Sequence, residues 1–364
     1  MYTDYAPKGV QFYYIYKALA HPGMNGYIDP YSLEERLMHI KEAEQQLGSK
    51  VTWLCDGMDN ATKHALGDRP NSEFVIDPEG KLVRIRSWSN PSQLRADLAE
   101  LVGPVAKPTT IQDLGLKEMS PPEIAPRGVV PRLDVPGGMT ALMIQPKESD
   151  QPYYAKLRAE ASWDLLNFGS GQIYLGFFMD PLYKVHWNNL ADPIRYTIKT
   201  QNGTTASPAT GEGPEVEAEA DMDPREFLVE IQNVNFDKPI ELTASYFACS
   251  DEEGWCKPIT QHYTIHFKPD WDTGRPSTPF SGGRGTRNRR GGFGRPGGFD
   301  TPGDPATFVA RLMEADANGD GKLSKDEAPE ALRQRFDRMD RNSDGFIDQN
   351  ELQQMGRRVR RGRG

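Results

Sequence analysis

The chain has few cysteines, three in 364 residues, and an odd number excludes a fully paired intramolecular disulfide framework. It lacks a run of about 18 apolar residues, the length that a membrane-spanning helix needs, so we expect no membrane span. The amino terminus has no basic segment followed by an apolar core, and the sequence therefore predicts no secretory signal. A basic excess is absent too: the net charge of −9 disfavours nucleic acid as a partner.

The length of the chain is enough for two or three folded units, at roughly 100–200 residues per domain. Stretches rich in proline, or in glycine and arginine, separate segments with the periodicity of folded domains. The predicted organisation is an α/β domain at 1–103, a linker at 104–136, a β-sandwich at 137–269, a disordered Gly/Arg/Pro linker at 270–303, a small α-helical module at 304–356 and a basic tail at 357–364.

The amino-terminal domain alternates between strand and helix patterns. The aromatic-rich stretch 11–16 predicts a buried strand, and 50–55 predicts a second one. Between them, Leu33, Leu37 and Ile40 form an apolar helical stripe within 32–47, with Ser32 as its cap. A hairpin at 73–86 and a helix at 92–102 complete an α/β layer with a mixed sheet.

The next domain has β character. Short apolar runs separated by turn residues predict a sandwich of strands. Candidate strands lie at 140–144, 172–178, 194–200, 226–232, 240–249 and 261–267. The acidic stretch 211–223 has few large apolar residues, so we expect a solvated loop there.

Two segments near the carboxy terminus, 316–327 and 340–351, fit the twelve-residue EF-hand calcium loop. Calcium prefers six to eight oxygen ligands, and this spacing brings side-chain oxygens, one carbonyl and a closing glutamate around one point. Gly321 and Gly345 allow the sharp turn at position 6. The candidate Ca²⁺ ligands are Asp316, Asn318, Asp320, Lys322, Ser324 and Glu327, then Asp340, Asn342, Asp344, Phe346, Asp348 and Glu351.

The loops begin 24 residues apart, so one helix at about 329–339 must leave the first loop and enter the second. We expect Leu323 and Ile347, at position 8 of each loop, to pair across a short β contact. The second loop has Asp348 where the first has Ser324, and this extra carboxylate predicts calcium binding at least as tight. Without a metal, the same composition would be an Asp/Asn/Gly-rich turn region.

Cys249 and Cys256 lie at the facing ends of two apolar strands, within reach of a disulfide. The connection between them is polar and looks exposed, and an exposed bridge exchanges more readily than a buried one. The pair is therefore either a redox pair or a structural disulfide. Cys55, on a predicted strand, fits a small buried side chain.

The motifs 179–189, 246–249 and 256–258 resemble the periplasmic amino-terminal domain of the disulfide reductase DsbD, over about 137–269. The resemblance implies an immunoglobulin-like sandwich in which Cys249 and Cys256 relay electrons. It also implies an extracytoplasmic (periplasmic or cell-surface) location and a thioredoxin-like redox protein as partner. The other interpretation is a non-enzymatic surface or scaffold protein stabilised by calcium.

The motifs 14–22, 51–60 and 74–80 resemble the thioredoxin-like fold, in its iodothyronine deiodinase and peroxiredoxin-like branch. The resemblance places His21 in the active-site region. The nucleophile of that branch lies upstream of the first strand seen here, so we expect this domain not to catalyse redox chemistry alone. A translation start further upstream would account for that segment and for a signal peptide. The sequence does not decide whether the protein is a thiol-disulfide oxidoreductase, nor its oligomeric state.

Overall fold

The computed structural model describes residues 1–19, 22, 27–48, 50–67, 71–110, 112–115, 128–135, 138–201, 203–273, 316, 318–328, 333, 336, 340, 342, 344–348 and 351. The chain divides into one unit of Met1–Ile124 with Asp272–Ser277 and another of Ala125–Trp271 with Thr278–Gly364. Residues 274–303 of the predicted linker at 270–303, the tail at 357–364 and His21 lie outside the described residues.

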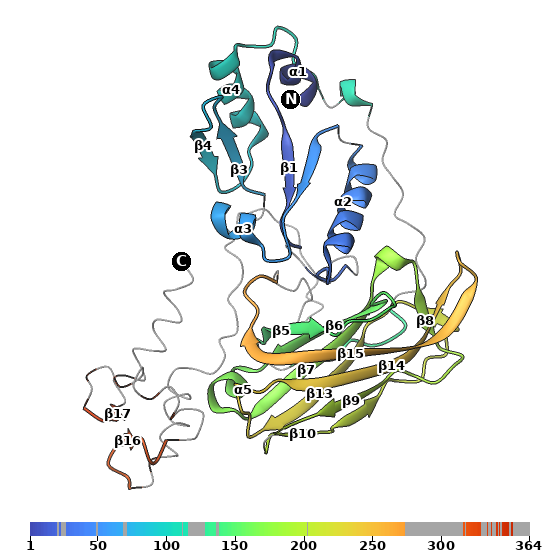
Figure 1. The fold of residues 1–364 in the computed structure, drawn as a ribbon, viewed down its shortest axis with the longest axis vertical. Helices are drawn as coiled ribbons and strands as arrows, with labels where there is room; N and C mark the ends of the chain where they lie inside the picture. Colours follow the sequence, from blue (N-terminus) through green and yellow to red (C-terminus); the bar gives the residue numbers. More distant parts are fainter. Residues whose placement is uncertain are drawn as a thin grey trace, which may run out of the picture. The chain divides into compact units, whose positions relative to one another are not determined.

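The first unit has the predicted strands and helices, and short helices besides that the sequence does not predict (Figure 1). Among the described residues its strands form two separate two-stranded sheets, so the predicted mixed sheet is not found there. Strands β1 and β2 pair in parallel, with Tyr13 opposite Thr52, while β3 and β4 form the predicted hairpin. Its elements are α1 (Tyr2–Tyr5), η1 (Ala6–Lys8), β1 (Tyr13–Tyr16), α2 (Leu33–Leu47), β2 (Thr52–Cys55), α3 (Ala61–Leu66), β3 (Glu73–Ile76), β4 (Leu82–Arg86), α4 (Pro91–Val102) and η3 (Gln112–Leu114).

Helix α2 begins as predicted, because the side chain of Ser32 accepts a hydrogen bond from the Glu35 backbone N–H at 3.2 Å. Its predicted buried face is wrong: Leu33 and Leu37 are 46% and 51% exposed. Of the predicted stripe Ile40 is buried, and the other buried side chains are the polar Glu35, Arg36 and His39. Polar partners explain this, since Arg36 donates to the carbonyls of residues 56 and 57, and the His39 ring meets the Tyr16 hydroxyl at 2.6 Å.

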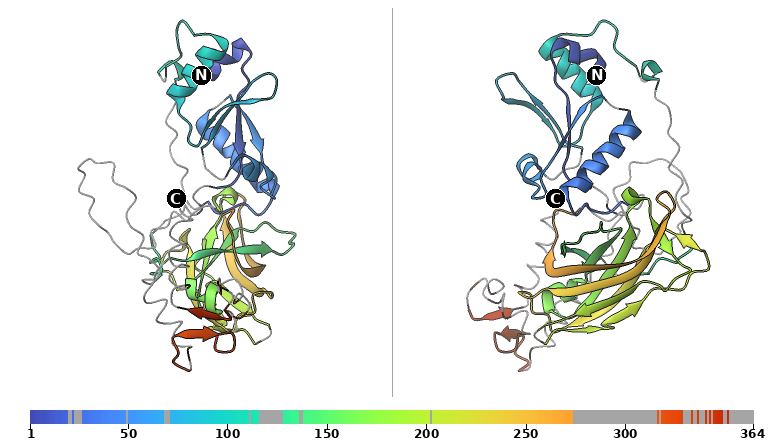
Figure 2. Two further views of the ribbon diagram at one scale, coloured as in Figure 1. Left: turned by 90° about the vertical axis from the view of Figure 1, so that its left-hand side faces the viewer. Right: turned by 45° about the vertical axis from the view of Figure 1, so that its right-hand side comes forward.

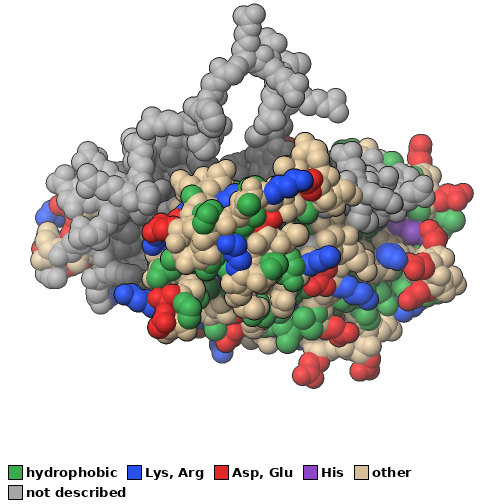
Figure 3. All heavy atoms as spheres, turned by 90° about the horizontal axis from the view of Figure 1, so that it is seen from above, with side chains coloured by type: hydrophobic (Ala, Val, Ile, Leu, Met, Phe, Trp, Pro, Cys, Tyr) green, Lys and Arg blue, Asp and Glu red, His purple; other side chains and the backbone are tan. Residues whose placement is uncertain are grey.

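Strand β1 is not buried as predicted, because Tyr13, Tyr14 and Ile15 are 54%, 45% and 37% exposed. Tyr16, at the end of the strand, contacts His39 of α2 through its hydroxyl. Other large apolar side chains of this unit are exposed as well, and Figure 3 shows apolar, acidic and basic side chains interspersed on the face seen there.

The second unit is a large β-rich body. Its strands follow the order β10-β13-β7-β6-β5-β15-β14-β8-β12, with β9 between β14 and β11. Its elements are β5 (Thr140–Pro146), β6 (Ala155–Ala161), α5 (Trp163–Phe168), β7 (Gly171–Met179), η4 (Pro181–Tyr183), β8 (His186–Asn188), β9 (Arg195–Lys199), β10 (Thr205–Ser207), β11 (Thr210–Glu212), β12 (Ala220–Asp221), β13 (Arg225–Gln232), β14 (Ile240–Ser250) and β15 (Trp255–Pro269). Figures 1 and 2 show β14 and β15 as long neighbouring strands.

Strand β5 joins two halves of this sheet, because its start pairs with β6 and its end with β15. Side chains from the two halves meet inside. The rings of Tyr196 on β9 and Phe227 on β13 lie 4.7 Å apart, and the Tyr263 hydroxyl donates to the Ala155 carbonyl at 2.8 Å. Burying a large apolar side chain contributes about 1.5–3 kcal/mol, so these facing rows stabilise the body.

The sequence did not reveal β6, because Lys156, Arg158 and Glu160 interrupt its apolar pattern. All three are nonetheless buried. Lys156 forms an ion pair with Asp180 at 2.7 Å, and Arg158 pairs with Glu160. Buried charges are tolerated when they are paired, which explains how a charged stretch becomes an interior strand.

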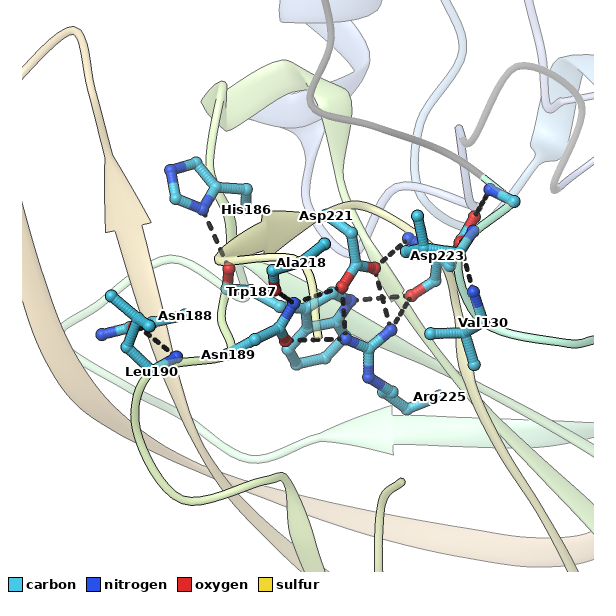
Figure 4. A network of polar contacts seen from close by, with 12 residues as sticks. Val130, His186, Trp187, Asn188, Asn189, Leu190, Ala218, Asp221, Asp223 and Arg225 are labelled. Atoms are coloured by element: carbon cyan, nitrogen blue, oxygen red, sulfur yellow. Dashed lines mark hydrogen bonds and ion pairs between the residues drawn. The ribbon is translucent and has the colours of Figure 1, made fainter. Parts of the chain in front are cut away.

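The predicted solvated loop at 211–223 is wrong in its second half, where Asp221 and Asp223 are 0% and 7% exposed. Asp221 accepts hydrogen bonds from Arg225 at 2.7 Å and from Asn189 at 2.7 Å. The Arg225 guanidinium lies 5.0 Å from the centre of the Trp187 ring. These partners satisfy the carboxylates and let an acidic stretch enter the interior (Figure 4).

Asp223 holds the start of the segment 128–135 in place through hydrogen bonds. Its carboxylate accepts hydrogen bonds from the backbone N–H groups of Gly128, Val129 and Val130 at 2.7–2.9 Å. Val130 is 8% exposed. Across the described part of the chain, no helix has the length and apolar character needed to cross a membrane.

We expect Arg225→Met to lower the free energy of unfolding of the second unit by about 3–5 kcal/mol, because it leaves the buried charge of Asp221 without its partner. Urea unfolding followed by tryptophan fluorescence measures this. The control is Arg195→Met, which removes an exposed pair with Glu212 and should therefore cost much less stability, because solvent screens exposed pairs. If both variants lose the same unfolding free energy, the buried ion pair of Arg225 and Asp221 does not stabilise the unit as described.

Arg225→Met should also change how the free energy of unfolding of the second unit depends on pH in the acid range. Burial by itself would raise the pKa of Asp221, but hydrogen bonds from Arg225 and Asn189 bring it below its usual 3.8. A lowered pKa in the folded state gives stability that is complete above about pH 4 and lost as the pH falls below it. Without Arg225 this contribution is absent, so the loss of stability in Arg225→Met should shrink as the pH falls below about 4.

Candidate functional site

The first calcium loop is organised by its own backbone. Asp316, at position 1, accepts hydrogen bonds from the N–H groups of Gly319 and Gly321, both at 2.8 Å. Glu327, at position 12, accepts from the N–H of Asn318 at 3.3 Å and of Ser324 at 3.1 Å. The first and last carboxylates are thereby tied to the middle of the same loop.

The second loop repeats this arrangement with a different sequence. Asp340 accepts from the N–H of Gly345 at 2.8 Å, and Glu351 accepts from the N–H groups of Asn342 at 3.2 Å and Asp348 at 3.1 Å. Gly321 and Gly345 both have positive φ, +79° and +85°, as position 6 requires.

A two-stranded sheet joins the loops, formed by β16 (Lys322–Ser324) and β17 (Phe346–Asp348). Leu323 stands opposite Ile347, and neither is exposed, so the predicted cross-loop pair is confirmed. The antiparallel pairing fixes how the two loops face each other. Phe336, 2% exposed, is helical and belongs to the predicted helix between the loops, whose other positions lie largely outside the described residues.

The twelve predicted ligands all lie among the described residues, six in each loop. Hydrogen bonds keep two of the carboxylates charged. The Ser324 hydroxyl lowers the pKa of Glu327, and the backbone N–H of Phe346 lowers that of Asp344. A charged carboxylate is the form that binds a hard cation.

Among the described residues, no three Asp, Glu, His or Cys side chains are arranged to hold a metal ion by themselves. The donor set explains how such a site still fits calcium. Each loop mixes carboxylates with an amide oxygen and a backbone carbonyl, and the first loop also offers the Ser324 hydroxyl. Oxygens of all these kinds are the ligands that calcium takes in EF-hand loops.

Cys249 and Cys256 form a disulfide, with Cα atoms 4.1 Å apart. They stand directly opposite each other near the tip of the β14–β15 hairpin. Their exposure differs, because Cys249 is 5% exposed whereas Cys256 is exposed to solvent. A reagent in solution therefore reaches the sulfur of Cys256 first.

Cys55, the remaining cysteine, lies half-buried at the end of β2 and is free. Burial raises the pKa of its thiol. No role for His186 follows from the sequence, although the structure places it on β8 opposite Cys249. Only the pairing of distant strands reveals this neighbour, and the local sequence carries no signal for it.

The comparisons with known proteins agree with the carboxy-terminal geometry. A family model described as EF hand matches residues 308–327 and 332–355. Neither the curated proteins nor the solved structures gave a match. The carboxy-terminal part of this chain is thus similar to the EF hand over both loops, which supports calcium binding in general.

Proposed function

We propose that this protein binds two calcium ions, one in each loop, through the twelve residues named above. The observation that carries the proposal is the shared bonding pattern. In both loops the carboxylates at positions 1 and 12 accept N–H groups from the same relative positions, although the loops differ in sequence. Two independent sequences with one geometry indicate one common ligand.

Calcium would stabilise the carboxy-terminal pair as well as occupy it. A ligand present at 100 times its dissociation constant adds about 2.7 kcal/mol to the stability of the folded state. The carbonyls of Lys322 and Phe346 stand at the start of β16 and β17, so an ion at either loop contacts the strand that joins it to the other.

Glu327→Gln and Glu351→Gln test the two sites separately. Each should remove one of two binding events, because the change takes away the carboxylate that closes its loop. We expect the affinity of that loop to fall by more than the roughly 10–100-fold typical of outer-shell changes around a metal. Calorimetric titration with calcium gives the stoichiometry. If both variants still bind two ions per chain, the ligand assignment is incorrect.

Substitutions at position 9 test the prediction that the second loop binds calcium at least as tightly as the first. Asp348→Ser should weaken the second loop and Ser324→Asp should strengthen the first, each by roughly threefold to tenfold, because a carboxylate adds attraction for the ion. Because the two substitutions exchange the position-9 residues of the two loops, each serves as the control for the other. An unchanged affinity in Asp348→Ser would defeat the ranking.

A second function, thiol–disulfide exchange at Cys249–Cys256 with a thioredoxin-like protein as partner, is favoured by the exposure of Cys256. Disulfides persist in oxidising compartments, which is consistent with the proposed extracytoplasmic location. In the alternative, the bridge is structural and the chain is a calcium-stabilised surface or scaffold protein. The immunoglobulin-like and thioredoxin-like fold assignments are part of this same proposal.

The reduction potential of the bridge separates these alternatives. For an exchanging pair we expect a value above about −300 mV, the level below which structural bridges of secreted proteins lie. The measurement equilibrates the protein with dithiothreitol buffers and counts thiols in denaturant. Cys256→Ser is the control, since it cannot form the bridge. A potential below that level indicates the scaffold role.

A further inference from the structure

Three neighbouring strands bring a histidine into line with the disulfide. On β14, Cys249 is paired with Cys256 of β15 on one side and with His186 of β8 on the other. Directly opposed residues of antiparallel strands point to the same face, with Cβ atoms about 4.5–5.5 Å apart. The imidazole and the two sulfurs therefore form one row across the sheet.

This row lies on the outer face of the sheet. The alternate residues of β14, Tyr246 and Ala248, are 2% and 0% exposed and point into the interior. In Figure 4 the ring of His186 projects away from the cluster of Asp221 and Arg225. The histidine is consequently available to the disulfide and does not belong to that buried network.

The two sulfurs have different parts in an exchange reaction. An incoming thiolate reaches the exposed Cys256, and the bond then breaks so that Cys249 leaves as a thiolate. Cys249 is only 5% exposed, and burial disfavours a charged sulfur. A neighbouring imidazolium would offset this cost, as cationic neighbours do for reactive cysteines.

The hydrogen bonds of His186 suit that role. Its Nδ1 lies 2.9 Å from the Trp187 carbonyl, which can only accept, so Nδ1 carries a hydrogen. Its Nε2 lies 3.3 Å from the Asp251 carboxylate at the hairpin tip.

Other charged groups near this end have partners of their own. Lys184 pairs with Glu252 at 2.6 Å in solvent. Glu253 accepts a hydrogen bond from the Trp255 ring N–H, and Lys257 lies 4.2 Å from the centre of the Trp255 ring.

We propose that His186, as an imidazolium, stabilises the Cys249 thiolate and so makes Cys256 the sulfur through which this disulfide exchanges. The inference rests on the proposed exchange function. A donor dithiol supplies the electrons. Its first thiolate bonds to Cys256, the bridge breaks, and the electron pair remains on Cys249 as a thiolate beside the imidazolium.

The second step returns the donor as a disulfide. Its other thiolate attacks the donor sulfur of the mixed disulfide and releases Cys256 as a thiolate. Solvent then supplies one proton to each of the two sulfurs. The donor has lost two electrons, and the protein holds two thiols.

The test uses the full chain with His186→Asn, and His262→Asn as the matched control. His262 lies on the outer face of β15 and bonds to Thr243 at 3.0 Å, away from the hairpin tip. We expect reduction by dithiothreitol to be roughly threefold to tenfold slower in His186→Asn below neutral pH. The difference should vanish at alkaline pH, where an imidazole is neutral. The control should match the wild type.

A second readout does not require exchange. In a Cys55→Ser, Cys256→Ser background, absorbance near 240 nm follows the Cys249 thiolate as the pH rises. His186→Asn should move this titration upward by about one pH unit, and His186→Lys, which keeps a positive charge, should restore it. A wild-type disulfide that resists dithiothreitol would refute the exchange function, while this titration still decides the role of His186. Identical titrations with and without the imidazole would overturn the inference.

Discussion

The ladder between β14 and β15 is the constraint on which most of the second unit depends. It runs from Ile240 opposite Ile265 to Ser250 opposite Trp255. Since side chains alternate between the two faces of a strand, this one register decides which residues enter the core. A slip by one residue would turn the buried row outward and separate Cys249 from its partner. Core packing and the position of the disulfide are thus set by the same hydrogen bonds.

A second constraint is that the buried carboxylates of the β-rich unit and those of the calcium loops need hydrogen-bond donors. In the β-rich unit, buried acids find an arginine or a row of backbone N–H groups, as Asp221 and Asp223 do. In the calcium loops the same role falls to the N–H groups of the turn itself, which hold Asp316 and Asp340 in place. Hydrogen bonds of this kind fix the shape of an acidic loop, which suits the proposed binding of a cation.

Patterns with a short range were readable from the sequence, whereas those set by distant partners were not. The twelve-residue loops, the cap of α2 and the hairpin at 73–86 each depend on neighbours within a few positions. By contrast, β6 looked too charged for an interior strand because its partner Asp180 is far along the chain. The burial of Asp221 and the approach of His186 to Cys249 likewise depend on strand pairing, which local periodicity does not encode.

Calcium binding at two equivalent loops is most directly tested by nuclear magnetic resonance on the ¹⁵N-labelled full chain. The amides of Gly321 and Gly345 donate to the position-1 aspartates at 2.8 Å, so an ion bound to those carboxylates must alter both resonances. The account predicts that both move during titration up to about 10⁻³ M calcium, the weakest range of extracellular modules, and saturate at two ions per chain. If neither resonance moves at that concentration, the account is contradicted.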